Sequence, residues 1–180
     1  MIEYRDVLRF WFVENGPAQW YAKDDEFDAS IRERFFETHL AACQGELWPW
    51  RETAKGRLAE ILVLDQFSRN LYREDARAYS MDGMALVLAQ EAILRGLDQH
   101  MSVQERSIFY LPFMHSESLK IHEEAMRIFD ELGLPDSIDF EKKHYDIIKE
   151  FGRYPHRNKV LGRDSTPQEI AFLTRQGSSF

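Results

Sequence analysis

Hydrophobic positions along this chain recur every three or four residues, which is the spacing of amphipathic α-helices, and no stretch of useful length alternates as a β-strand would. The first such segment, Glu3–Val13, is apolar over most of its circumference and is expected to be largely buried. Further helices are predicted from Asp24 to Cys43, from Thr53 to Ser68, from Ser80 to Arg95, from Ser102 to Pro112, from Leu119 to Leu132, from Ile138 to Phe151 and from Pro167 onward. The pattern therefore predicts an all-α fold of about eight helices that pack as antiparallel pairs.

Several of the predicted helices carry recognisable start and stop signals. Residues 102–105 and 166–169 have the spacing of a capping box, and Ser80 is predicted to cap the fourth helix. Gly133 is expected to end the sixth helix. The acidic cluster at residues 24–28 lies at a predicted helix start, where negative charge is favoured. It lacks the alternating acidic positions and the turn glycine of a calcium loop, so we interpret it as a capping feature.

The composition indicates one folded domain. Of the 180 residues, 44% are hydrophobic and 13% are aromatic, which is enough for a sizeable, aromatic-rich core. We therefore expect a single helical domain over residues 1–180, with a tail over residues 176–180 that frays. The single cysteine, Cys43, falls on an apolar helix face and is interpreted as a buried small side chain rather than a nucleophile.

The net charge narrows the classes of partner. A formal net charge of −8 works against general nucleic-acid binding, which needs a broad cationic face to displace counterions. Charged residues interrupt the apolar positions of the first segment, and no apolar run reaches membrane-spanning length. We expect a soluble, cytoplasmic protein that binds neither nucleic acid nor membrane. A local basic pocket is compatible with this charge.

One stretch, Phe151–Arg163, concentrates cationic and hydrogen-bonding groups and contains no acidic residue. Gly152 and Pro155 interrupt any helix here, so these side chains are expected on a turn, where they can converge from several directions. A related pair, Arg69-Asn70, closes an earlier segment of the chain. Two such Arg-Asn corners in one small domain predict one shared polar site.

Four blocks carry a resemblance to a known family: LDQFSRNLYR, YLPFMHSES, FGRYPHRNKVLGR and DSTPQE, in this order. With them, the chain resembles the bacterial family called domain of unknown function 924 over nearly its whole length. The resemblance implies a helical fold similar to a tetratricopeptide-like solenoid, and it implies no known activity. Ser68 stands where such proteins more often have proline, and Tyr154 stands where they usually have phenylalanine. Neither change removes a charged or hydrogen-bonding group.

The candidate ligand-binding residues come from separate segments of the chain. They are Asp65, Gln66, Arg69, Asn70, Arg73, His144, Arg153, Arg157, Asn158 and Arg163. In the functional interpretation, guanidinium groups hold a phosphate or carboxylate bidentately. In the structural interpretation, the same arginines and asparagines satisfy carbonyl groups at helix ends, and His144 is a core histidine with paired nitrogens.

Two classes of function stay open. The first is a helical-repeat binding module for a small anionic or phosphorylated ligand or an acidic peptide. The second is an enzyme acting on a small anionic substrate, with His115 or His156 as general acid or base and Glu117 as its partner. A site gathered into one closed pocket favours the enzyme, whereas an exposed groove favours the binding module.

A metal-dependent form of the enzyme would use His115, Glu117, His144 and His156. The chain lacks a His-Glu-x-x-His pattern, and nearby arginines would oppose a cation, so no metal ligands are predicted. Serine-hydrolase elbows and Gly-rich phosphate loops are also absent from the sequence. The sequence identifies neither a cofactor nor an oligomeric state.

Overall fold

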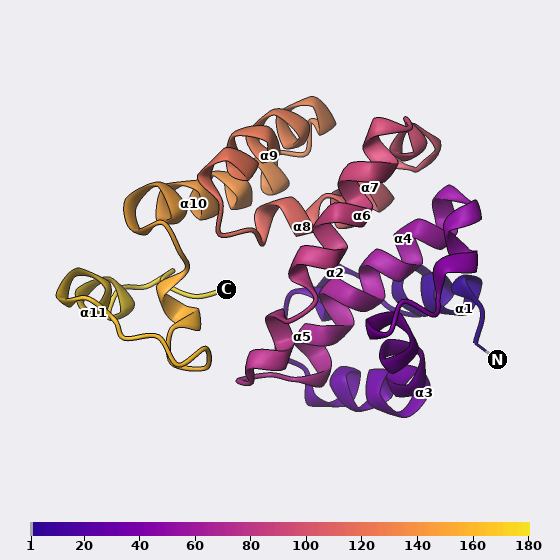
Figure 1. Cartoon of the computed structure of the whole chain (residues 1–180), viewed down its shortest axis with the longest axis horizontal. Helices are drawn as coiled ribbons and strands as arrows, with labels where there is room; N and C mark the ends of the chain where they lie inside the picture. Colours follow the sequence, from indigo (N-terminus) through magenta and orange to yellow (C-terminus); the bar gives the residue numbers. More distant parts are fainter. Residues whose placement is uncertain (1) are drawn as a thin grey trace. The chain divides into compact units, whose positions relative to one another are not determined.

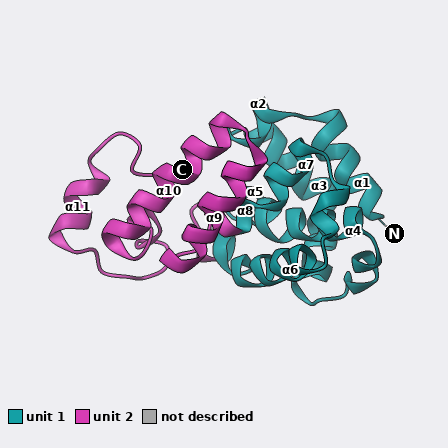
Figure 2. Ribbon diagram, turned by 90° about the horizontal axis from the view of Figure 1, so that it is seen from above, with its two compact units in different colours: residues 1–73, 77–112 teal, residues 74–76, 113–180 magenta. Residues whose placement is uncertain are grey.

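The computed structural model describes residues 2–180, and 73% of the chain is helical. No strand forms among these residues, which confirms the all-α prediction. The chain divides into two compact units, coloured separately in Figure 2: unit 1 comprises residues 1–73 and 77–112, and unit 2 comprises residues 74–76 and 113–180. The single domain over residues 1–180 stays a prediction. No helix within residues 2–180 combines the length and the apolar character needed to cross a membrane.

The helices of unit 1 follow the predicted segments, with short additions (Figure 1). They are α1 (Tyr4–Arg9), α2 (Pro17–Trp20), α3 (Asp25–Cys43), α4 (Ala54–Leu62), α5 (Ser68–Leu71), α6 (Asp82–Leu94), α7 (Val103–Phe109) and α8 (Leu111–Met114), whose last two residues belong to unit 2. Two π-helical turns, Phe10–Glu14 and Val63–Phe67, continue α1 and α4. Three 3₁₀ turns lie at Trp48–Glu52, at Ala76–Tyr79, whose first residue belongs to unit 2, and at Leu97–His100.

The centre of unit 1 is α4 with its π-helical continuation. Every residue from Gly56 to Ser68 is buried, although this segment contains Arg57, Glu60 and Asp65. The predicted helix from Thr53 to Ser68 is thus present, with Thr53 capping it by accepting a hydrogen bond from the Gly56 amide at 2.9 Å. A helix buried on all sides must have a partner for each charge that it carries, because an unpaired buried charge is strongly destabilising.

Aromatic rings form much of the core of unit 1, as the composition predicts. The rings of Phe10, Phe35 and Phe67 lie 5.1 to 6.2 Å apart, where α3 meets the π-helical turns that follow α1 and α4. Trp20 stacks on Trp11 at 5.4 Å, and its indole nitrogen donates a hydrogen bond to the Trp11 carbonyl oxygen. This bond explains why the short helix α2 is held in place. Edge and stacked ring contacts of this kind add to the stabilisation from buried area.

Unit 2 is built on an antiparallel helix pair. Its helices are α9 (Leu119–Leu132), α10 (Pro135–Phe151) and α11 (Pro167–Leu173), with a 3₁₀ turn at Pro155–Arg157. Gly133 adopts the left-handed conformation with φ of 75° and ends α9, as predicted. The two long helices pack along each other (Figure 1), and the fully buried ring of Tyr154 lies in the core that Ile147 and Ile148 line.

The helix ends show which local signals determine the structure. Ser102 and Thr166 form the predicted capping boxes, and Asp24 accepts hydrogen bonds from two amides of the first turn of α3. The prediction that Ser80 caps α6 is wrong: the cap residue is Met81, and the Ser80 hydroxyl instead donates to the Arg77 carbonyl oxygen at 3.0 Å. The helix predicted from Ile138 begins three residues earlier, at Pro135.

Cys43 lies half-buried beside His39, with its Sγ 3.7 Å from Nδ1 of the ring. The Ser68 hydroxyl donates to the Leu64 carbonyl oxygen, so Nε2 of His39 donates to Ser68 and leaves Nδ1 as an acceptor for the thiol. Burial raises the pKa of the Cys43 thiol and lowers the pKa of His39 to about 4. Both groups are therefore neutral near pH 7, which supports the expectation that this cysteine is not a nucleophile.

The tight packing of α4 generates a first prediction. A Cβ atom on Gly56 would lie 1.9 Å from the Trp50 carbonyl oxygen, so Gly56→Ala should lower the free energy of unfolding by about 1–3 kcal/mol. Gly83→Ala in α6 is the control, because no heavy atom lies within 4 Å of its added Cβ; it should leave stability unchanged or raise it by up to about 1 kcal/mol. Urea unfolding of both variants measures the difference. Equal stabilities would contradict this account of the α4 packing.

Candidate functional site

The basic stretch Phe151–Arg163 forms a compact turn at the end of α10. Gly152 ends the helix in the left-handed conformation with φ of 69°, and its amide donates to the Ile148 carbonyl oxygen at 2.8 Å. After the 3₁₀ turn, the Arg163 amide donates to the Asn158 carbonyl oxygen at 2.8 Å, which closes a loop in the backbone. The predicted turn is therefore present, and its side chains reach different parts of unit 2.

Glu117 is the counter-ion of Arg163. Its two carboxylate oxygens accept hydrogen bonds from the Arg163 guanidinium at 2.8 and 2.9 Å, and one of them also accepts from the Tyr154 amide at 2.8 Å. Burial by itself would raise the pKa of Glu117, but these hydrogen bonds and the charges of Arg157 and Arg163 hold it below its ordinary value. Glu117 is thus an ionised group that is fully engaged with the turn, which favours a structural role over proton transfer.

Glu169 is the counter-ion of Arg153, near the start of the turn. It is buried, and its oxygens accept hydrogen bonds from Arg153 at 2.7 and 2.8 Å and from the Asn158 amide group at 3.3 Å. The Arg153 hydrogen bond is the main reason that the pKa of Glu169 falls to about 2. Asn158 is fully used, because its oxygen accepts from Arg163 at 2.9 Å and its nitrogen also donates to Ser165. The stretch contains no acidic residue of its own, and two carboxylates from elsewhere in unit 2, Glu117 and Glu169, supply its counter-charges.

Arg157 lies over the ring of Tyr154. Its guanidinium carbon is 4.6 Å from the ring centre, and one of its terminal nitrogens donates to the His115 carbonyl oxygen at 3.0 Å. Only 6% of Arg157 is exposed. The side chain is therefore held in one orientation by an aromatic face and a backbone carbonyl.

Histidine rings surround the same tyrosine. The rings of His144 and His156 lie 5.7 and 5.6 Å from the ring of Tyr154, and Phe180 stacks on His144 at 3.8 Å. Nδ1 of His144 is 2.7 Å from the Phe140 carbonyl oxygen, so this nitrogen carries the proton and Nε2 is the acceptor. Burial lowers the pKa of His144 to about 3. The hydrogen bond to Phe140 opposes this effect, and the charges of neighbouring histidines such as His115 add to it.

The chain end has defined contacts in the structure. Besides the stacking of Phe180, the Ser178 hydroxyl donates to the Leu173 carbonyl oxygen at 3.2 Å. The frayed tail that we expect over residues 176–180 stays a prediction, and ring stacking on a buried histidine is a contact that the local sequence does not reveal.

A buried network that the sequence does not reveal lies behind Tyr154. His122 and Glu141 are both inaccessible to solvent, and Nδ1 of His122 is 2.6 Å from one oxygen of Glu141. Nε2 of His122 lies 2.7 Å from the Ser116 carbonyl oxygen and 3.0 Å from the Tyr154 hydroxyl, which itself donates to the Met114 carbonyl oxygen at 2.5 Å. Since carbonyl oxygens only accept, Nε2 carries a proton. One further proton lies between Nδ1 and Glu141.

The second oxygen of Glu141 has no hydrogen-bond partner among the described residues. Burial raises the pKa of this carboxyl group, although the hydrogen bond and the charge of His122 oppose the effect. The only sequence signal for this network is a histidine at an otherwise apolar position of the sixth predicted helix, which is weak because such histidines are common in cores.

The Arg69-Asn70 corner of unit 1 is also matched by carboxylates. Arg69 donates to both oxygens of Asp82 at 2.8 and 3.0 Å and to the Asp65 carbonyl oxygen at 2.9 Å. Burial alone would lower the pKa of Arg69, but Asp65 and Asp82 raise it above its ordinary value. Gln66 donates to the Asp65 carboxylate at 2.6 Å. Asp65 and Gln66 lie in the π-helical turn, a feature often found at functional sites.

Asp28 of α3 binds the remaining residues of this corner. It accepts a hydrogen bond from the Asn70 amide group at 2.7 Å and forms an ion pair with Arg73. The sequence suggests only a helix-capping role for Asp28 and a first-turn position for Asp82. The sequence does not reveal their long-range partners, because 42 residues separate Asp28 from Asn70 and 13 residues separate Asp82 from Arg69.

The structure thus brings the candidate residues together in two groups, one in each unit. In unit 1 these are Asp65, Gln66, Arg69, Asn70 and Arg73; in unit 2 they are His115, Glu117, His144, Arg153, His156, Arg157, Asn158 and Arg163. The single shared site predicted from the two corners stays a prediction. Within residues 2–180, no three His, Cys, Asp or Glu side chains are placed to share a metal ion.

Comparison with known proteins places this all-helical chain in a family. Residues 7–177 match the model of a family described as a bacterial protein of unknown function (DUF924), so the chain belongs to that family. A solved structure of a protein of unknown function, ATU0120 from Agrobacterium tumefaciens, is 40% identical in sequence and has a TM-score of 0.90. The match covers 94% of this chain and 96% of that one. None of the curated proteins compared with the chain matches it.

The buried His122–Glu141 pair generates a pH prediction. Because the pKa of Glu141 is raised in the folded state, the folded chain retains a proton that the unfolded chain loses above about pH 4.3, so this group's contribution to stability declines as pH rises, by at most about 1.4 kcal/mol per pH unit. Glu141→Gln has no proton to lose, and its amide can donate to Nδ1 of His122. The variant should therefore gain stability relative to the unsubstituted protein between pH 5 and pH 8.

Urea unfolding at each pH measures this difference, and the exposed Glu123→Gln on the neighbouring helix is the control. Other titrating groups act equally in both proteins and cancel. Parallel stability curves for Glu141→Gln and the unsubstituted protein would contradict the single shared proton.

The Arg153–Glu169 pair should behave in the opposite way. In the folded state the pKa of Glu169 is about 2, which is below the ordinary glutamate value. Glu169 therefore contributes stability above about pH 4.3, and this contribution is lost as the pH falls toward 2. Glu169→Gln should lower the melting temperature at pH 7, and the deficit should shrink between pH 4 and pH 3. Exposed Glu150→Gln on α10 should show no such pattern. A deficit that is the same at pH 7 and pH 3 would mean that shape, rather than charge, determines the role of Glu169.

Proposed function

We propose that unit 2 binds a small anionic ligand beside Tyr154, with Arg157 as the main anion contact. The observation that carries this proposal is the gathering of a buried guanidinium and the rings of His144 and His156 around one aromatic side chain. Arg157 is already oriented by the Tyr154 face and the His115 carbonyl oxygen, so little side-chain entropy is lost when a ligand binds. A guanidinium in such a position can form two parallel hydrogen bonds to a phosphate or carboxylate.

The state of His144 defines the ligand further. This ring is neutral at pH 7 and its free nitrogen accepts rather than donates, so it cannot add positive charge for an anion. It can accept a hydrogen bond from a hydroxyl group. The site therefore suits a ligand that carries an anionic group and a hydroxyl, such as a phosphorylated metabolite.

A small ligand is favoured over the other partner that we considered, an acidic peptide. The groups in question surround one tyrosine ring, whereas a helical-repeat module that binds peptides spreads its contacts along an extended concave face. The tetratricopeptide-like solenoid and the cytoplasmic location stay predictions. The antiparallel pairing of α9 and α10 supports the former.

Binding is also favoured over catalysis. A general base works best when its pKa is near the operating pH, and the pKa of His144 is about 3. Glu117, the expected partner of a catalytic histidine, is ionised and occupied by Arg163 and the Tyr154 amide. An enzyme acting on a small anionic substrate, with His115 or His156 in the acid-base role, stays the second candidate.

Thermal unfolding with added anions tests the proposal. Phosphate at 100 times its dissociation constant should stabilise the protein by about 2.7 kcal/mol and raise the melting temperature, relative to sodium chloride of equal ionic strength. Arg157→Lys should abolish most of this gain, because lysine keeps the charge but loses the two-pronged donor geometry. Arg127→Lys on the exposed side of α9 is the matched control and should retain the full gain.

The stability of the variants without phosphate decides between the two interpretations of Arg157. A binding role predicts that Arg157→Lys stays within about 1 kcal/mol of the unsubstituted protein. If phosphate has no effect and Arg157→Lys alone lowers stability by several kcal/mol, Arg157 is a structural tie between the turn and residue 115, and the proposed ligand site is wrong.

A further inference from the structure

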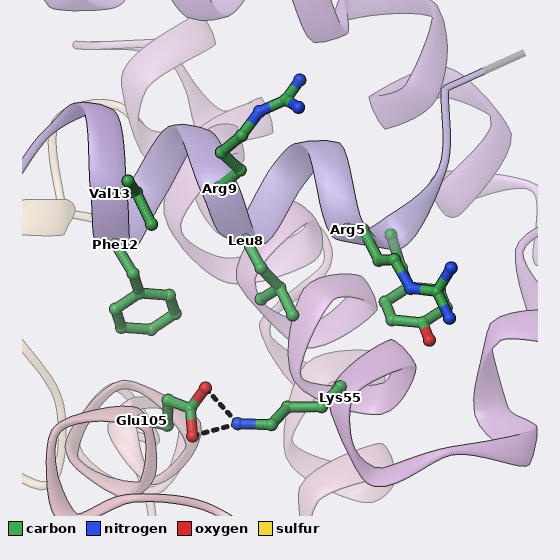
Figure 3. A pocket seen from close by; sticks show the side chains of 8 residues that line it. Arg5, Leu8, Arg9, Phe12, Val13, Lys55 and Glu105 are labelled. Carbon is green, nitrogen blue, oxygen red and sulfur yellow. Dashed lines mark hydrogen bonds and ion pairs between the residues drawn. The ribbon is translucent and has the colours of Figure 1, made fainter.

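A second candidate site lies in unit 1, beside α1 and far along the sequence from Tyr154. An open groove of about 360 Å³ runs along this helix (Figure 3). Its lining residues are Tyr4, Arg5, Leu8, Arg9, Phe12, Val13, Lys55 and Glu105. The volume is at the lower end of the range for small-molecule sites.

One wall of the groove is apolar. Leu8 and Phe12 project from α1 and its π-helical continuation toward the groove in Figure 3, and Val13 beside them is 77% exposed. An apolar side chain that is so exposed loses contact with water only when another molecule covers it.

The opposite wall is an ion pair whose charges cancel. Lys55, at the start of α4, bonds to both carboxylate oxygens of Glu105, at the start of α7 (Figure 3). Burial alone would raise the pKa of Glu105, but the bonds from Lys55 and from the Ser102 amide keep it below its ordinary value. This wall therefore offers no net charge to a ligand.

Arg5 supplies the uncompensated charge of the groove. Its guanidinium carbon lies 5.3 Å from the centre of the Tyr4 ring, and among residues 2–180 no carboxylate forms an ion pair with it. Arg9, at the rim, differs because it pairs with Asp6 at 3.1 Å and with Glu14 at 3.4 Å. The groove thus has one unpaired positive charge at one end and an apolar wall along its length.

We propose that the α1 groove binds a small amphiphilic monoanion, with its acidic head on Arg5 and its apolar chain against Leu8, Phe12 and Val13. The seven residue-to-residue steps from Arg5 to Phe12 span about 10 Å of helix, which is the length available to the apolar chain of the ligand. A single charge is expected because, among the described residues that line the groove, Lys55 and Arg9 already have carboxylate partners and Arg5 has none. This site is independent of the anion site proposed in unit 2.

Octanoate is the probe. Octanol, which keeps the apolar chain but lacks the charge, and acetate, which keeps the carboxylate but lacks the chain, are the two controls. In ¹H–¹⁵N spectra, octanoate below its micelle-forming concentration should shift the amides of residues 4–14, and both controls should bind at least tenfold more weakly. Arg5→Gln should weaken octanoate binding about tenfold, and Val13→Ser should weaken it severalfold. Arg9→Gln should leave the affinity unchanged, because that arginine is already paired.

Any one of the following results would overturn the proposal. Octanol binding as tightly as octanoate would show that Arg5 plays no part, and acetate binding as tightly would show that the apolar wall plays none. Equal losses in Arg5→Gln and Arg9→Gln would show only a diffuse attraction to positive charge. Saturating phosphate should not displace octanoate; displacement, or shifts confined to residues 113–180, would place octanoate at the unit 2 site and leave the α1 groove without a ligand.

Discussion

A buried charge in a protein interior is tolerated only when an opposite charge and hydrogen bonds meet it, since breaking such a pair costs about 3–5 kcal/mol. This requirement determines how both units of the present chain are assembled. In unit 1, the inaccessible carboxylate of Glu60 accepts two hydrogen bonds from Arg51 at 2.6 and 2.7 Å, and buried Arg57 bonds to Glu91. The central helix α4 is thereby tied to the turn before it and to α6. In unit 2, Glu117 and Glu169 tie the basic turn to the starts of α9 and α11.

The two Arg-Asn corners illustrate the same rule at closer range. In the first corner, Asn70 donates to Asp28 and Arg69 donates to Asp82. In the second corner, Asn158 and Arg153 both donate to Glu169. Judged from the sequence alone, the excess of hydrogen-bond donors in these corners implies a bound ligand. The structure assigns most of those donors to carboxylates that arrive from other helices, so the number of donors in a turn is a poor guide to ligand binding. What distinguishes Arg157 is its aromatic support and the histidines around it.

The sequence predicted those features that depend on neighbouring residues. Capping by the acidic cluster that begins at Asp24 and by Ser102 and Thr166, and the end of α9 at Gly133, follow from interactions within one helical turn, and all are present. The pairing of Arg69 with Asp82, of Arg73 with Asp28 and of Arg153 with Glu169 was not predicted, nor were the network of His122 with Glu141 and the π-helical turns. Each depends on residues brought together by the fold, and a π-helical turn has no sequence signature of its own. Glu169 combines a local feature with one that depends on the fold: its capping role was predicted, and its pairing with Arg153 was not.

The proton positions in unit 2 constrain any chemistry that the site performs. The carbonyl oxygens of Ser116, Met114 and Phe140 fix protons on His122, Tyr154 and His144 respectively, because a carbonyl oxygen can only accept. Moving any of these protons would leave a buried donor or acceptor unpaired, which costs about 1–3 kcal/mol each time. In the ligand site that we propose, Tyr154 is therefore a rigid support rather than a group that exchanges protons. A site with fixed protons and a guanidinium held over an aromatic ring is better suited to recognising one charge state of a ligand than to transferring protons to it.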